Sequence, residues 1–76
     1  MNNVASRCRV NGHAMRALRR LSGKTQLDLA RMGGVTHSYI SRLERGERLG
    51  CTHEVLERLA AALGVPISAL ISAGSS

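Results

Sequence analysis

The amino-acid sequence predicts an all-α fold, a compact five-helix bundle that contains a helix-turn-helix. Its 76 residues are enough for one small domain. Hydrophobic residues make up 43% of the chain but only one residue is aromatic, so a core must be built from aliphatic side chains, which favours packed helices over a sheet. Apolar residues also recur at helical spacing in segments separated by glycines, and this periodicity predicts where each helix lies.

The first predicted elements are an N-terminal arm and a helix. Residues 1–11 are polar and lack periodicity, so we expect them to form a flexible arm. A Ser-Gly pair at positions 22–23 ends the helix that follows. This helix is predicted by apolar residues at positions i, i+3, i+4 and i+7, namely Ala14, Ala17, Leu18 and Leu21.

The next two helices form the helix-turn-helix. Thr25 is suited to cap the second helix because its hydroxyl can accept a hydrogen bond from an unpaired backbone amide, and Asp28 completes an approximate capping box. A glycine pair at 33–34 ends this helix, since glycine adopts the left-handed backbone of a tight turn. The third helix follows Thr36 and runs to about Arg45. Two short helices joined by a glycine-containing turn are typical of a helix-turn-helix.

Two further helices complete the predicted bundle. Thr52 is suited to cap a fourth helix, which has the strongest amphipathic pattern of the chain and ends at Gly64. Pro66 suits the first turn of a short fifth helix, because its missing N–H would be unpaired there anyway. Residues 73–76 are expected to form a disordered tail, which leaves residues 12–72 as the domain. The apolar side of the fifth helix is formed by Ile67, Leu70 and Ile71.

The charge of the chain indicates a polyanionic partner. Eleven Lys and Arg residues stand against five Asp and Glu residues, which gives a net charge of +6. Nucleic acid and an anionic membrane surface both fit this charge, but the basic residues are spread over several capped helices, which disfavours the membrane surface. No apolar run approaches the roughly 18 residues of a membrane span, and no signal segment opens the chain, so we expect a cytoplasmic protein.

The sequence gives no pattern for catalysis, a metal or a cofactor. Cys8 and Cys51 belong to no CxxC pair and do not match a zinc-ligand spacing with the nearby histidines, so we interpret them as two unrelated thiols, with a metal site or a disulfide as alternatives. The chain also lacks a nucleophile elbow and a glycine-rich phosphate loop. We therefore expect a protein that is not an enzyme and that has no small-molecule substrate.

Six short motifs between Met15 and Leu70 follow one another in a specific order and spacing. They are TQ at 25–26, LA at 29–30, GVT at 34–36, IS at 40–41, LERG at 43–46 and ALGV at 62–65. This segment resembles the lambda-repressor-like, or Cro/repressor, helix-turn-helix family, whose small members include phage repressors and restriction-modification controller proteins. The resemblance implies a sequence-specific double-stranded DNA-binding transcription regulator whose third helix enters the major groove.

The resemblance also implies the residues that contact DNA. The positions that face base edges are Gln26, His37, Ser38 and Arg42. The positions that contact the sugar-phosphate backbone are Thr25, Thr36, Tyr39, Ser41, Arg45, Gly46 and Arg48. Helical periodicity agrees, because an inward-facing Ile40 and Leu43 turn positions 37, 38, 41 and 42 outward. Arg42 is the strongest candidate, since arginine can donate two hydrogen bonds to guanine O6 and N7, whereas Tyr39 is as well suited to cover the edge of the core.

Three structural expectations accompany the resemblance. It implies a salt bridge between Arg19 and Glu44, the alternative being two unpaired surface charges. Gly33 stands where the family usually has a better helix former, which would cost about 1 kcal/mol in a helix. One unit touches too few bases for specificity, so we expect a homodimer on a pseudopalindromic operator with half-sites about one helical turn apart. Its predicted interface is Ile67, Leu70 and Ile71.

The alternative function is an antitoxin whose main partner is a protein toxin.

Overall fold

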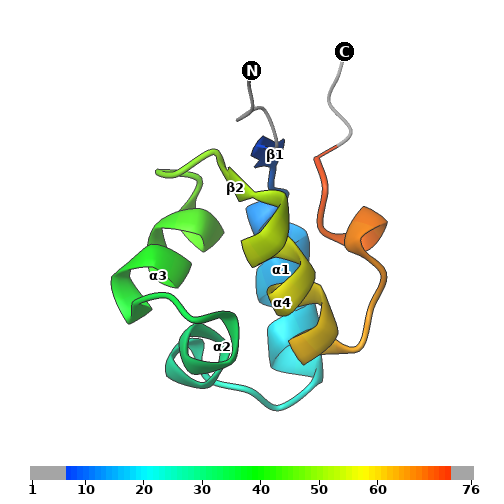
Figure 1. Ribbon diagram of the computed structural model, residues 1–76. Helices are drawn as coiled ribbons and strands as arrows, with labels where there is room; N and C mark the ends of the chain where they lie inside the picture. Colours follow the sequence, from blue (N-terminus) through cyan, green and yellow to red (C-terminus); the bar gives the residue numbers. More distant parts are fainter. Residues whose placement is uncertain (1–6, 73–76) are drawn as a thin grey trace.

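The computed structural model describes residues 7–72, which form four α-helices, a 3₁₀ turn and a two-stranded sheet (Figure 1). Helices α2 and α3 form the predicted helix-turn-helix at one side of the molecule, and α1 and α4 lie beside them. The elements in chain order are β1 (Arg7–Arg9), α1 (Gly12–Leu21), α2 (Gln26–Gly33), α3 (His37–Arg45), β2 (Gly50–Thr52), α4 (His53–Leu63) and η1 (Ile67–Ala69).

The threonine caps predicted for the second, third and fourth helices are confirmed. Each of these threonines has extended backbone and accepts a hydrogen bond from the amide three residues later, which satisfies one of the unpaired amides of the first turn. The second and third helices end at Gly34 and Gly46, whose φ angles of 72° and 77° are left-handed. The caps are Thr25, Thr36 and Thr52.

The prediction of a fifth α-helix is wrong. The chain after Pro66 makes only the 3₁₀ turn η1, because Leu70 turns into the core and Ile71 pairs with Val10 in an isolated β-bridge. This also corrects one residue of the predicted dimer interface. Leu70 is 0% exposed and cannot contact a second copy, whereas Ile67 is half-buried against the core and Ile71 is 39% exposed.

The predicted N-terminal arm is wrong for its last residues. β1 pairs antiparallel with β2, and Cys8 lies directly opposite Cys51. The two cysteines, which we interpreted as unrelated, are therefore cross-strand neighbours, and both are free thiols. A three-residue strand is too short to show alternation in the sequence, and its partner lies about forty residues away, so only the folded chain reveals the pairing. Residues 1–6 of the arm and the predicted tail at 73–76 lie outside the described residues.

The core is built from aliphatic and sulfur-containing side chains, as the composition predicts. The side of α1 that faces the core differs from the predicted one, because Met15 is buried and Leu21 is 84% exposed. Gly33 has a packing role: a Cβ there would lie 2.5 Å from Cδ2 of Leu59, so the absent side chain lets α2 approach α4 closely. The largest fully buried side chains are Met15, Leu29, Ile40, Leu43, Leu56, Leu59, Leu70 and Cys51.

Candidate nucleic-acid interface

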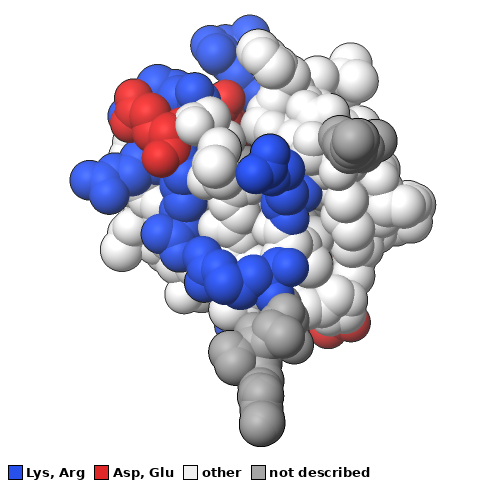
Figure 2. All heavy atoms as spheres, turned by 90° about the horizontal axis from the view of Figure 1, so that it is seen from above, with Lys and Arg blue, Asp and Glu red and all other residues white. Residues whose placement is uncertain are grey.

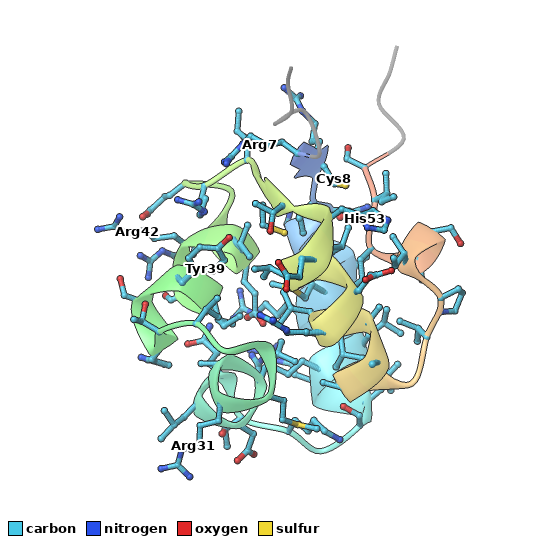
Figure 3. The ribbon with its side chains drawn as sticks, viewed as in Figure 1. Arg7, Cys8, Arg31, Tyr39, Arg42 and His53 are labelled. Carbon is cyan, nitrogen blue, oxygen red and sulfur yellow. The ribbon has the colours of Figure 1, made fainter. Side chains whose placement is uncertain are left out.

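The exposed side of α3 carries three of the four residues predicted to face bases. His37, Ser38 and Arg42 are exposed, whereas Ile40 and Leu43 on the same helix are 0% and 1% exposed. Side chains four positions apart lie next to each other on a helix, so positions 38 and 42 share one face, with position 37 beside them. Figure 3 shows Arg42 projecting from α3 away from the rest of the molecule. Groups that can donate and accept hydrogen bonds are thus presented together.

Two of the predicted phosphate contacts lie at helix N-termini. Thr25 and Thr36 are both exposed, and their hydroxyls accept hydrogen bonds at 3.0 Å from the amides of Asp28 and Tyr39. Unpaired backbone amides and the helix dipole favour an anion at such an end. At the start of α2, the Asp28 carboxylate already accepts a hydrogen bond from the Thr25 backbone amide at 2.9 Å. This hydrogen bond lowers the pKa of Asp28.

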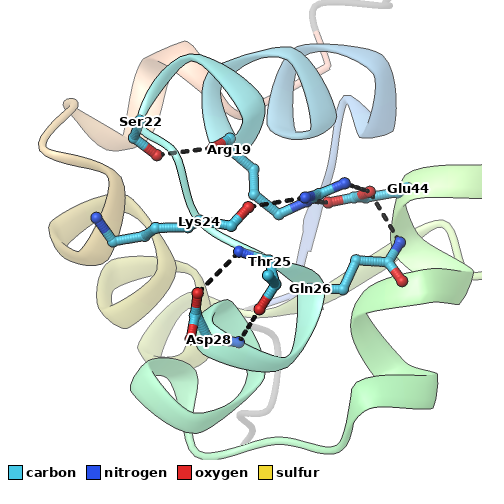
Figure 4. Close-up of polar contacts among 7 residues, drawn as sticks. All are labelled: Arg19, Ser22, Lys24, Thr25, Gln26, Asp28 and Glu44. Atoms are coloured by element: carbon cyan, nitrogen blue, oxygen red, sulfur yellow. Dashed lines mark hydrogen bonds and ion pairs between the residues drawn. The ribbon is translucent and has the colours of Figure 1, made fainter.

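The ion pair predicted between Arg19 and Glu44 is present and buried (Figure 4). Arg19 Nε donates to Glu44 Oε2 at 2.7 Å and a second guanidinium nitrogen donates to Oε1 at 3.1 Å. The side chains are 10% and 1% exposed, so the alternative of two unpaired surface charges is wrong. Arg19 also donates to the backbone carbonyl of Lys24 at 2.8 Å. This network connects α1, the α1–α2 turn and α3, and it fixes the orientation of α3.

Gln26 has a hydrogen-bond partner within the protein. Its side-chain Nε2 donates to Glu44 Oε1 at 3.0 Å, and the residue is half-buried. In the structure this amide therefore belongs to the Arg19–Glu44 network, and its contact with DNA stays a prediction. The sequence could not show this, because the choice of partner depends on how closely α2 packs against α3, which is a tertiary property.

The loop after α3 carries the predicted phosphate contacts Arg45 and Arg48. Arg45 donates to both carboxylate oxygens of Glu47 at 3.0 Å and to Oγ of the half-buried Ser41 at 2.8 Å. These hydrogen bonds lower the pKa of the Glu47 carboxyl and raise the pKa of Arg45. Both partners are more than half exposed, so the pair is weak. Gly46 between them is exposed.

Tyr39 lies at the edge of the core, which was one of the two roles considered for it. Its ring packs against the core, and the Arg48 guanidinium stacks 4.3 Å above the ring. Burial raises the pKa of the Cys51 thiol. The side chain holds Arg48 in place by a cation–π contact, and the phosphate contact of the Tyr39 hydroxyl stays a prediction.

Basic side chains spread over the end of the molecule that carries the sheet, as the view from above shows (Figure 2). Acidic atoms appear in two places in that view, among the basic side chains at the upper left and at the lower right edge. Arg7 and Arg9, which the sequence placed in an arm with minor-groove contact or disorder as the alternatives, lie on β1 and are exposed. Within residues 7–72, no three His, Cys, Asp or Glu side chains gather as metal ligands, and no helix has the length and apolar character needed to cross a membrane.

A short capped helix that presents polar side chains outward, fixed against a preceding helix by a glycine corner, defines the class of helix-turn-helix proteins. The chain belongs to the Helix-turn-helix family, whose match covers residues 15–70. It is a lambda-repressor-like member, as its similarity to solved structures shows. Among curated proteins, none matches the chain.

Three solved structures illustrate the similarity. The restriction-modification controller protein C.AhdI from Aeromonas hydrophila is 33% identical, with a TM-score of 0.71 over 76% of this chain and 86% of that one. SinR, a master regulator for biofilm formation, solved in complex with DNA, is 29% identical, with a TM-score of 0.73 over 78% and 97%. The DNA-binding domain of the P22 C2 repressor is 33% identical, with a TM-score of 0.70 over 75% and 74%.

Proposed function

We propose that this protein is a sequence-specific double-stranded DNA-binding transcription regulator that inserts α3 into the major groove. The observation that carries the proposal is the exposed face of α3, where His37, Ser38 and Arg42 lie together on a helix held by the buried Arg19–Glu44 pair. The DNA complex of SinR, a protein with the same fold, supports it. Nothing in the comparisons favours the antitoxin alternative.

The three residues have different roles in the proposal. The Arg42 guanidinium reads a guanine through paired hydrogen bonds to O6 and N7, which no other base offers in the major groove. His37 and Ser38, in the first turn of α3, contact a base edge or the adjacent phosphate. Arg45 exchanges Glu47 for a phosphate oxygen, and this contact adds affinity without sequence preference.

The proposed regulator acts as a homodimer on two related half-sites. The extents of the described chain are 38 × 25 × 23 Å, so two copies centred one helical turn of DNA apart, about 34 Å, lie next to each other on one side of the duplex. Within the predicted interface, Ile71 is exposed and Ile67 is half-buried, so both keep accessible surface. Two half-sites double the number of bases that are read, which a unit of this size needs for specificity.

Selection of bound duplexes from a random pool tests the proposal directly. We expect a defined half-site to emerge, and Arg42→Ala should then weaken binding by about 1 to 3 kcal/mol and relax the preference at one base pair. Arg45→Ala is the matched control of equal charge: it should weaken binding to all duplexes alike and reduce the salt dependence. Enrichment of no sequence, or equal effects of both substitutions on every duplex, would contradict the proposal.

A further inference from the structure

We propose that Arg7 and Arg9 of β1, together with Arg48, form a second contact site for DNA, which binds backbone phosphates beside the groove that α3 enters. The inference rests on the proposed function and extends it to a strand outside the helix-turn-helix. Nothing in the resemblance or in the family match covers residues 7–9, since both begin at residue 15.

The pairing of β1 with β2 places the two strand arginines on one face. Side chains two positions apart in a strand point the same way, and Arg7 and Arg9 are both exposed while Cys8 between them faces Cys51. A hollow of about 320 Å³ opens beside them. Three of the six residues that line the hollow are arginines, and none is acidic. The lining residues are Arg7, Cys8, Arg9, Arg48, Leu49 and Gly50.

Arg48 is held in this hollow before any ligand binds. Its guanidinium stacks 4.3 Å above the Tyr39 ring, so the side chain has little freedom left to lose. Its Nε is also buried, and within residues 7–72 it has no hydrogen-bond partner. A buried donor without a partner is unfavourable, so a shift of the Arg48 side chain that brings Nε to an acceptor is favoured. A phosphate oxygen suits such a donor, because guanidinium groups bind phosphate through paired, charge-assisted hydrogen bonds.

The hollow is continuous with the surface proposed to face DNA. Arg48 follows Arg45 in the loop that leads from the end of α3 into β2, and β2 holds β1. Figure 3 shows Arg7 beside this loop, and Figure 2 shows basic side chains spread across this end of the molecule. A duplex whose major groove receives α3 has its flanking phosphates next to that loop. We therefore assign the hollow to the duplex backbone and not to a free anion.

The test compares three double variants by fluorescence anisotropy over a series of potassium chloride concentrations, on the selected operator and on a random duplex. In Arg7→Gln/Arg9→Gln, the slope of log K against log salt should become shallower by up to about 2, since each phosphate contact contributes roughly 0.9, and the change should be the same on both duplexes. Arg20→Gln/Arg58→Gln, which removes equal charge from exposed positions on α1 and α4, should keep the parent slope. Arg7→Lys/Arg9→Lys, which keeps both positive charges, should also keep most of the parent slope.

Several outcomes would overturn the inference separately from the proposed function. If the parent protein has a steep salt slope and Arg7→Gln/Arg9→Gln leaves that slope unchanged, the second contact site is excluded and the proposed function stands. An equal decrease of the salt slope in Arg20→Gln/Arg58→Gln would show that the effect comes from net charge and not from this site. Binding of inorganic phosphate by the free protein that depends on both arginines, with no change in the DNA slope, would assign the hollow to a free anion. Circular dichroism and thermal unfolding show that the variants compared are folded. A parent that binds no duplex would contradict the proposed function itself, and this site with it.

Discussion

The buried pair of Arg19 and Glu44 shows how single residues position the candidate interface. Glu44 lies on α3, and its two oxygens accept hydrogen bonds from Arg19 on α1 and Gln26 on α2. A buried ion pair contributes little net stability over an apolar pair of the same shape, since both charges lose their hydration. Its effect here is geometric: because three helices meet at one carboxylate, α3 has a defined orientation from which Arg42 extends.

Removal of one partner of this pair should be strongly destabilising. In Arg19→Met, the Glu44 carboxylate stays buried without its cation, and we expect the free energy of unfolding to fall by about 3 to 5 kcal/mol in urea denaturation. The matched control is Arg58→Met, because Arg58 pairs with an exposed Glu54 at 2.9 Å and such surface pairs contribute less than about 1 kcal/mol. Equal losses in the two variants would contradict the assigned role of burial. Arg19→Met/Glu44→Leu should recover most of the stability.

Some residue roles followed from the sequence and others did not. The three threonine caps depend on spacing along one short segment, and the exposure of Arg42 follows from helical periodicity, so both could be predicted. The partners of Gln26 and Tyr39 could not. The Gln26 amide binds Glu44, eighteen residues away, and Tyr39 contacts Cys51 and Arg48, which reach it only when β2 folds back over the end of α3.

At the scale of elements, the packing of α1 against α3 depends on Gly12. A Cβ at this position would lie 2.2 Å from the Leu43 carbonyl oxygen and 2.9 Å from that of Glu44. These are backbone atoms at the end of α3, which cannot move without shifting the helix. The first turn of α1 therefore touches the backbone of α3 directly, and this contact requires glycine.

Gly12→Ala should destabilise the protein although alanine favours helices. Overpacking of this kind costs about 1 to 3 kcal/mol, and the clash is with backbone, so we expect a net loss in urea unfolding and weaker operator binding through displaced α3. His13→Ala on the same turn, where the side chain is exposed, is the control and should leave both quantities nearly unchanged. A Gly12→Ala protein as stable as the parent would show that α1 and α3 can separate freely.

The capping box of α2 should make stability depend on pH. In the folded chain, hydrogen bonds from Thr25 hold the pKa of Asp28 below its ordinary value of 3.8, and the bond from the Thr25 backbone amide has the largest effect. A lowered folded pKa gives stability that is present above the unfolded pKa and is lost as the pH falls through the folded pKa. In Asp28→Asn, unfolding measured from pH 6 down to about pH 2 should therefore show a shallower acid decline. A decline as steep as that of the parent would exclude this contribution.

The helices and the strands differ in how far sequence determines them. α1 to α4 carry their own start and stop signals, and their apolar spacing is local, so their positions could be predicted. β1 and η1 carry no such signals. Three residues of β1 become a strand only because β2 offers an edge, and Leu70 leaves the helical path only because the core has room for it.

At the scale of the whole molecule, charge and size limit what one chain can do. A net charge of +6 on a domain 38 Å long gives strong attraction to any duplex, and this attraction is independent of sequence. One exposed face of α3 adds only a few base contacts to it. Under the proposed function, specific occupancy of one site therefore calls for a second copy of the chain.

The spacing of half-sites tests this requirement. Two copies that contact each other on one side of the duplex need half-sites about 10 base pairs apart, so an insertion of about 5 base pairs turns the second half-site to the opposite side. On that operator, anisotropy should show the affinity falling to that of a duplex with one half-site. The control is a substitution of about 5 base pairs outside both half-sites, which should have little effect. Because the monomer's own contacts are identical in all these duplexes, an affinity that ignores the insertion would mean that each chain binds alone.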